Sequence, residues 1–390
     1  MIKPLKKYEP SSAWKKLLIV LALAGGITFI IGLAKNPQRA WADFLIGYFY
    51  WLSMALGGLF FAALQHITGA YWSATVRRIS ELFIAYIPVS LVLFIVLVIG
   101  LPHLYSWTHH EALLTDPDLI KKAAYLNTPF FIVRHLALYA VALLLGGKIV
   151  KNSFQQDEKP NPALSLQNVT LSAPFIMLFA ITYTLASIDL MMSLSPRWFS
   201  TIFGVYCWGG LFYQALAGIT ITAICLRKKE AVGDYITDDH LHDLGKLMFA
   251  FLVFWGYVAF SQYMLIWYGN LPEETFYFIA RNGAYKPVSL ALMLGKFVIP
   301  FFLLIIRPAK RNANWLLFVA LWFVVAQALD IYWMVMPTFF AEKPVFGLME
   351  IFIFLGFFAL FALSVVTLLK RVYPVAINDP WINDALHHRQ

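Results

Sequence analysis

The sequence predicts an all-α integral membrane protein with about ten transmembrane helices. Of its 390 residues, 61% are hydrophobic and only 13% are charged, about half the charged share of a typical soluble domain. The charges cluster between long apolar runs instead of following amphipathic faces. Because a helix satisfies its own backbone polar groups in lipid, we expect the chain to lie within a bilayer.

Ten apolar runs are long enough to cross a membrane, which takes roughly 20 residues. They lie near 16–34, 41–66, 81–100, 128–149, 172–194, 200–226, 246–268, 288–307, 314–336 and 346–369. The first has the basic start of a signal peptide, but its length and the lack of a clean cleavage site favour a membrane helix. The polar, proline-containing segment 151–167 is predicted to be a linker.

The distribution of basic residues predicts the orientation. Of 30 Lys and Arg residues, 20 fall on the side that holds both termini and 8 on the other, while Arg134 and Lys296 lie within helices. Cytoplasmic loops are rich in Lys and Arg, so both termini are predicted to be cytoplasmic. The same bias explains the net charge of +9 without a nucleic-acid partner, since no basic stretch could follow a phosphate backbone.

An acid within an apolar run occurs twice at one spacing. Asp189 lies seven residues before Pro196, and Asp330 lies seven residues before Pro337. Four helices separate the two motifs, which predicts a parallel repeat of a four-helix unit. We expect a single membrane domain made of an N-terminal helix, two repeats, and a C-terminal helix with its tail, at 1–40, 41–197, 198–338 and 339–390.

Ionisable residues inside the membrane cost roughly 2.5–3.5 kcal/mol each and need an explanation. The third helix of each repeat supplies a base and the fourth an acid in the outer third of the membrane. These are Arg134 or His135 with Asp189, and Lys296 with Asp330; Glu350 lies near the outer end of the last helix. They are either static ion pairs or a proton-handling layer or polar ligand site.

A second polar layer is expected near the cytoplasmic face, at Gln65, His66, Arg77, Arg78, Glu81, Asp243 and Lys246. Uncharged polar residues lie between the layers, at Thr182, Tyr183, Thr184, Tyr213, Gln214 and Gln327. With internal water these residues could carry protons. Without water, these residues form ordinary interhelical hydrogen bonds.

No redox cofactor or metal is expected within this chain. It has two cysteines, Cys207 and Cys225, no CxxCH haem motif and no cysteine cluster for iron–sulfur or zinc. His66 and His135 differ in predicted depth by on the order of 20 Å, too far to share one haem iron.

Two long outer loops, 101–127 and 269–287, are candidates for docking to partners, although ordinary solvated loops explain them equally well. The side chains in question are Trp107, His109, His110, Glu273, Glu274 and Arg281.

Three segments resemble the ActF subunits of bacterial alternative complex III, which belong to the NrfD-like membrane subunits. They are KNPQRAW at 35–41 leading into FLIGYFYW and the Arg77-Arg78 pair, SLSPRWFSTIFGVY at 193–206, and FSQYMLIWYGNLPEE at 260–274. The resemblance implies two NrfD-like four-helix bundles with flanking helices in the bacterial inner membrane. It also implies a complex that oxidises menaquinol and reduces cytochrome c or another acceptor.

In such a respiratory or photosynthetic complex, the resemblance implies haem c and iron–sulfur clusters in partner subunits. The partners are then multihaem cytochrome c and iron–sulfur subunits, a homologous NrfD-like subunit with the quinol site, and small membrane subunits. For this chain it implies a proton path at Asp189, Asp330, His135 and Lys296. A stand-alone secondary transporter and a structural anchor are the alternatives, and transporter sites usually lie at broken helices in the midplane.

Overall fold

The computed structural model describes residues 5, 7–109, 111 and 115–389. Within these residues, ten helical spans are long and apolar enough to cross a membrane and no strand occurs, which confirms the all-α membrane fold. The first half comprises α1 (Ser12–Lys35), α2 (Pro37–Ile67), α3 (Arg77–Glu81), η2 (Leu82–Tyr86), α4 (Ile87–Leu104), α7 (Thr128–Ala140), α8 (Gly147–Glu158) and α9 (Pro162–Leu190). The second half comprises α10 (Phe203–Lys228), α11 (Asp238–Gly269), α13 (Lys286–Leu292), α14 (Ile299–Leu304), α16 (Ala313–Phe339) and α17 (Leu348–Leu369).

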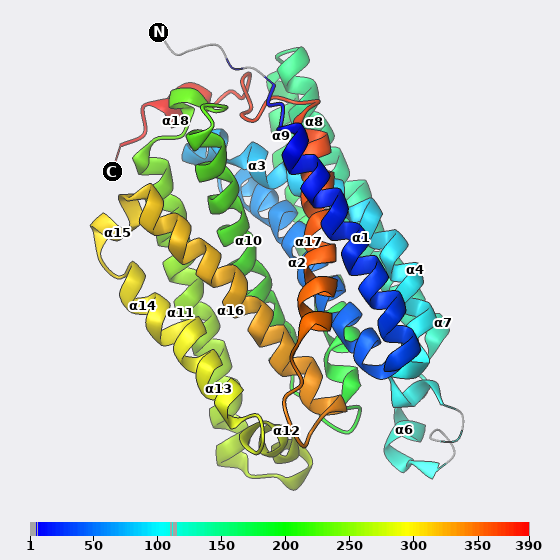
Figure 1. Ribbon diagram of the computed structural model, residues 1–390. Coiled ribbons are helices and arrows are strands. Elements are labelled where there is room, and N and C mark those ends of the chain that lie inside the picture. Colours follow the sequence, from blue (N-terminus) through cyan, green and yellow to red (C-terminus); the bar gives the residue numbers. More distant parts are fainter. Residues whose placement is uncertain (1–4, 6, 110, 112–114, 390) are drawn as a thin grey trace.

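The spans pack as two four-helix groups. The first group contains α2, α3–α4, α7–α8 and α9, and the second contains α10, α11, α13–α14 and α16. Helix α2 contacts α10 and α16 and so joins the groups, while α17 packs on α2 and α1 packs on α17 (Figure 1). The groups contain the helices of segments 41–197 and 198–338, and their origin as copies of one unit stays a prediction.

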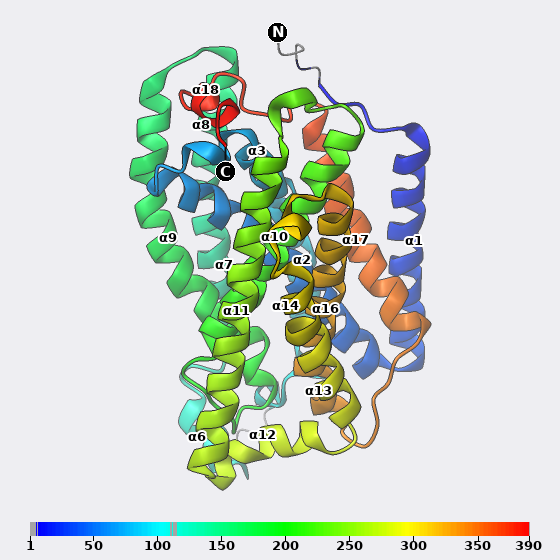
Figure 2. The same cartoon turned by 90° about the vertical axis from the view of Figure 1, so that its left-hand side faces the viewer.

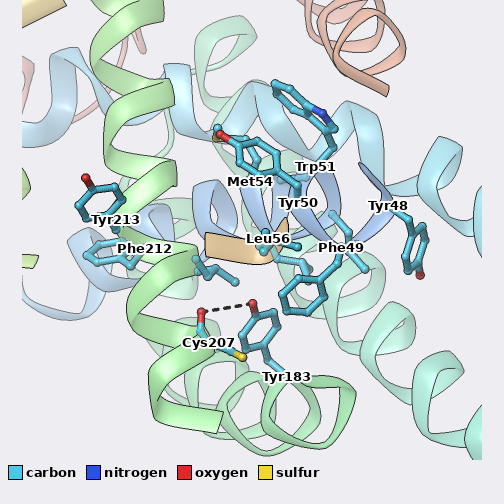
Figure 3. Packing of buried hydrophobic residues seen from close by; sticks show 14 of the residues in the cluster. Tyr48, Phe49, Tyr50, Trp51, Met54, Leu56, Tyr183, Cys207, Phe212 and Tyr213 are labelled. Carbon is cyan, nitrogen blue, oxygen red and sulfur yellow. Dashed lines mark hydrogen bonds between the residues drawn. The ribbon is translucent and has the colours of Figure 1, made fainter. Parts of the chain in front are cut away.

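Helix α2 is the centre of the molecule. Its most apolar stretch is completely buried, and four successive aromatic side chains from Tyr48 to Trp51 project in different directions into the core (Figure 3). Close approach to α10 requires a glycine, because a Cβ on Gly57 would lie 2.5 Å from the Cβ of Ala215. Small residues at helix contacts are a general device of membrane bundles.

The start of α1 and the short helix α18 (Ile382–Leu386) lie at one end of the molecule, which we call the terminal end (Figures 1 and 2). The short helices α6 (Pro117–Lys122) and α12 (Pro272–Asn282) lie at the opposite end, which we call the distal end. Two further short helices connect spans, η1 (Tyr71–Thr75) and α15 (Arg307–Arg311).

Both third spans contain a π-helical turn. In the first group it is Val141–Gly146, between α7 and α8, and in the second it is Met293–Val298, between α13 and α14. Lys296 lies within its turn, whereas Arg134 precedes its own by seven residues. The two bases therefore differ in their positions relative to these turns.

The linker predicted at 151–167 is wrong, because α8 and α9 occupy nearly all of it. The polar residues pack between the two helices, where Asn152 Nδ2 donates to Asn168 Oδ1 over 2.9 Å. Asn161 caps the second helix by accepting from the backbone N–H of Ala163 at 3.1 Å. A polar sequence here reflects helix-to-helix hydrogen bonding.

The two prolines of the repeated motif have different positions. Pro196 follows the end of α9, but Pro337 lies inside α16. A helical proline has no N–H and leaves the carbonyl four residues earlier without its donor. Arg281, from α12, replaces that donor: its Nε donates to the carbonyl of Trp333 at 3.2 Å and its Nη2 to that of Met334 at 2.7 Å. The helix can therefore continue past its proline, and it ends two residues later at Phe339.

Candidate functional site

The first buried ion pair joins α7 to α9 near the distal end. Arg134 Nε donates to Asp189 Oδ2 at 2.6 Å and its Nη2 to Oδ1 at 2.9 Å. The remaining Nη1 donates to the carbonyl of Tyr125 at 3.0 Å, and the guanidinium stacks on that residue's ring at 3.9 Å. Both charged side chains are buried. The two charges of this pair cancel, and the hydrogen bonds around them compensate for the loss of water, as a buried ion pair requires.

His135, the other base considered for Asp189, has a different environment. Its Nδ1 lies 4.0 Å from Asp189 Oδ2 but 2.8 Å from the carbonyl of Phe131. A carbonyl can only accept, so Nδ1 carries the proton and Nε2 has the lone pair. Among the described residues, no hydrogen-bond partner reaches this buried Nε2. His135 thus presents an unused proton acceptor beside the Arg134–Asp189 pair.

The second buried ion pair joins the π turn of the second group to α16. Lys296 Nζ lies 2.5 Å from Asp330 Oδ2 and 2.6 Å from Gln327 Oε1. Asp330 also accepts from the hydroxyl of Tyr206 on α10, and the ammonium lies 3.8 Å from the ring centroid of Trp255 on α11. All four helical spans of the second group therefore contribute to this cluster.

Glu350 belongs to a third polar cluster at the distal end. It forms a two-point ion pair with Arg39, at 2.6 and 2.7 Å, and its Oε2 accepts from the N–H of Gly347 at 2.7 Å. Asp43, one turn after Arg39 on α2, is 3% exposed, and neither carboxyl oxygen has a partner among the described residues. Asp43 was not among the predicted site residues, although a lone acid near the start of an apolar run was the available signal.

At the terminal end, Glu81 lies within a network of buried charges. Arg78 contacts Glu81 at 3.1 Å and Asp157 at 2.9 Å. Arg77 lies 3.9 Å from Glu81 and forms an ion pair with Asp379 on the C-terminal tail. The predicted linker and the tail thus supply two carboxylates, Asp157 and Asp379, that were not predicted to lie here.

His66 lies beside this network, with Nε2 3.5 Å from the side-chain nitrogen of Asn168. The space lined by His66, Asp157, Asn168 and Asp379 has no room for a water molecule. In the second group, Asp243 contacts Lys246 at 2.6 Å and His388, on the tail, at 2.7 Å. The tail therefore covers the terminal ends of both groups.

Hydroxyl groups connect part of the interior of the first group. The hydroxyls of Tyr48 and Tyr139 lie 2.9 Å apart, and that of Tyr139 donates to Ser90 at 3.2 Å. The buried hydroxyl of Tyr86, one turn before Ser90, has no partner among the described residues. These residues were not predicted from the sequence, because the position of a tyrosine in an apolar helix does not reveal which way its hydroxyl points.

The interior residues that were singled out have mostly local roles. The hydroxyl of Tyr183 lies 2.9 Å from Ser53 Oγ and 3.5 Å from the carbonyl of Cys207 (Figure 3). Thr182 donates to a carbonyl of its own helix, and Gln214 Nε2 donates to the carbonyl of Tyr50 at 3.0 Å. These bonds are typical interhelical and intrahelical contacts.

The distal loops include two residues that cannot serve as docking points. Trp107 is 1% exposed and donates to Ser193 at 3.3 Å, and Arg281 is 2% exposed where it caps α16. Both were candidates for docking, and burial excludes that role for them. Glu273 is exposed and Glu274 is half-buried. His109 is exposed, with Nε2 2.9 Å from the carbonyl of Pro102; His110 lies outside the described residues.

In the described part of the chain, no group of three His, Cys, Asp or Glu side chains is arranged to hold a metal ion. No protein-family model and no curated protein matches the sequence.

Proposed function

We propose that this chain is a membrane subunit of a quinol-oxidising electron-transfer complex of the alternative complex III type. In this proposal it contributes a proton path and no redox centre. It lies in the bacterial inner membrane with both termini in the cytoplasm. The segments that resemble the ActF subunits support the family, and the ten-span fold is compatible with it.

The observation that carries the proton path is the free Nε2 of His135 beside the Arg134–Asp189 pair. Tyr139 lies one turn further along the same helix face and continues through hydrogen bonds to Tyr48 and Ser90. A neutral histidine with an open lone pair can accept a proton that neither member of a saturated ion pair can accept easily.

The route continues toward the terminal end along one helical span. Tyr86 and then Glu81 follow Ser90 at about one-turn intervals in the direction of the charged network. The hydroxyl of Tyr86 has no described partner, so a water molecule bridging it to its neighbours would complete a hydrogen-bonded chain. The route lies wholly in the first group, and the second group's Lys296–Asp330 cluster supplies a separate buried pair.

The test uses the complex in which the chain is isolated, reconstituted into vesicles with menaquinol and an acceptor. Electron transfer and proton movement are measured separately. Asp189→Asn and Tyr139→Phe are expected to lower the protons moved per quinol oxidised several-fold. Tyr183→Phe is the matched control, since it also removes a buried, hydrogen-bonded hydroxyl but lies off the route. If Asp189→Asn and Tyr139→Phe both retain quinol oxidation and proton movement, the proton path is wrong.

Two other functions make different predictions in the same preparation. A secondary transporter would be purified alone under mild detergent, whereas a respiratory subunit would be purified with haem-stained partners. A structural anchor is favoured by the well-satisfied ion pairs. It predicts that replacing a whole pair by neutral residues leaves proton movement unchanged.

A further inference from the structure

An open groove of about 770 Å³ runs along the terminal half of the membrane-facing surface. It lies between η2–α4, α8 and α17, and its walls are mainly aliphatic and aromatic, including Ile84, Val89, Leu143, Phe154, Leu360 and Leu363. The volume falls within the range of roughly 300–1,000 Å³ that is usual for small-molecule sites. The groove lies away from the buried ion pairs of the distal end.

The groove exists because its two walls pack on different helices. Helix α17 packs on η2 and α2, whereas α8 packs on α9. At the floor, Gly147 has no side chain, and a Cβ placed there would meet only Ile84 Cδ1 at 3.9 Å. A side chain at this position would therefore enter the groove without a clash at its Cβ.

The polar groups of the groove have an uneven distribution. The hydroxyls of Ser364 and Thr367 donate to carbonyls of their own helix at 2.8 and 2.6 Å, so their hydrogens are already used. At the terminal mouth lie the exposed cations Lys151 and Arg371, with one acid, Glu158. Among the described residues, neither cation has a recorded ion pair.

We propose that this groove binds one glycerophospholipid with an anionic head group. Its acyl chain lies along the apolar walls, and its phosphate lies at the mouth with Lys151 and Arg371. Basic pockets between membrane helices at the head-group level are suited to anionic lipids. The hydroxyls of the groove are occupied, and its remaining donors are Gln155 and the two cations. Because two of these three donors carry a full positive charge, they favour an anionic phosphate over a neutral quinone head group.

The test is a lipid titration of the full-length protein, in the form in which it is purified, followed by native mass spectrometry. Phosphatidylglycerol is compared with phosphatidylcholine of the same acyl chains. The double variant Lys151→Gln/Arg371→Gln is expected to weaken phosphatidylglycerol binding about 25-fold, at about five-fold for each cation. Lys228→Gln/Lys229→Gln removes two exposed cations at the same end but outside the groove, and should leave binding unchanged.

A second variant tests the groove independently of charge. Gly147→Phe should weaken the binding of both lipids because the ring occupies the floor, and its thermal stability should match the wild type. Equal affinity of the wild type for both lipids would overturn head-group recognition. Unchanged lipid binding by Gly147→Phe would show that the lipid lies elsewhere. Displacement of phosphatidylglycerol by menaquinone at equal stoichiometry would assign the groove to a quinone.

Discussion

Breaking the Lys296–Asp330 pair should reveal how strongly its members depend on one another. Both side chains are essentially inaccessible to solvent, at 0% and 1% exposure. Removal of one member of a buried pair usually costs about 3–5 kcal/mol, because the other charge stays buried without compensation. The single variants Lys296→Met and Asp330→Asn are therefore both expected to destabilise the protein, but to different extents.

The neighbours of each charge determine how much stability each single variant loses. In Lys296→Met, Asp330 keeps only the hydroxyl of Tyr206, so we expect the full loss of about 3–5 kcal/mol. In Asp330→Asn, the ammonium keeps Gln327 Oε1 at 2.6 Å and the ring of Trp255 at 3.8 Å. A desolvated cation–π contact contributes about 2 kcal/mol, so the expected loss is about 1–3 kcal/mol.

The double variant Lys296→Met/Asp330→Asn removes both charges. Neutral replacement of a whole buried pair is often without cost, so its stability should lie within about 1 kcal/mol of the wild type. The coupling energy of the double-mutant cycle is then about 3 kcal/mol or more.

Equilibrium unfolding of the purified protein by SDS in mixed micelles, followed by circular dichroism, measures all four free energies. The matching cycle, Arg134→Met with Asp189→Asn, provides a comparison in the first group. Losses in the Lys296–Asp330 cycle that simply add would refute the idea of an electrostatically coupled buried pair.

Three further predictions concern the loops and the tail. Arg281→Met should lower the free energy of unfolding in SDS by about 1–3 kcal/mol, because the carbonyls that Arg281 contacts lose their donor. The loss should be smaller in a Pro337→Ala background, where the helix regains the backbone N–H that proline lacks. Equal losses in both backgrounds would contradict the capping role. Asp379→Asn should cost about 1–3 kcal/mol, because Arg77 loses its direct hydrogen-bonded partner and, of its described carboxylate partners, keeps only Glu81 at 3.9 Å. Asp384→Asn, at an exposed position, should change stability by less than about 0.5 kcal/mol; thermal unfolding compares them, and equal losses would contradict the role of the Arg77–Asp379 pair. Desolvation raises the pKa of Asp116, but hydrogen bonds from its arginine partner and a backbone amide outweigh it and lower the pKa. Their stabilisation is present above the ordinary aspartate pKa of about 3.9 and lost as pH falls through the lowered value. Hydrogen-exchange protection around Asp116 should therefore fall as the pH is lowered below about 4, and constant protection would argue against the contact.

The buried acids show how far sequence reasoning reaches. Asp189 and Asp330 were recognisable because a charge within an apolar run is rare and costly. The partner of Asp189 was not recognisable, since Arg134 and His135 are adjacent and both reach the same depth. The fold directs the guanidinium to the acid and the imidazole to a backbone carbonyl.

Arg281 illustrates the same limit outside the membrane spans. It was a candidate for docking because basic residues in long loops are usually exposed. The structure buries it against α16, where it donates to carbonyls next to a helical proline. Its partner lies more than fifty residues away in the sequence, so no local pattern announces the contact.

The sequence by itself determined the class of this protein and the number of its membrane spans. Hydropathy and internal hydrogen bonding are properties of each segment alone, so they can be evaluated without knowledge of its neighbours. Only the tertiary structure decided which charges meet, which tyrosines form a chain and where the groove between α8 and α17 opens. Many of these helices are apolar on nearly every face, and their periodicity does not specify the rotation of each helix toward its partners.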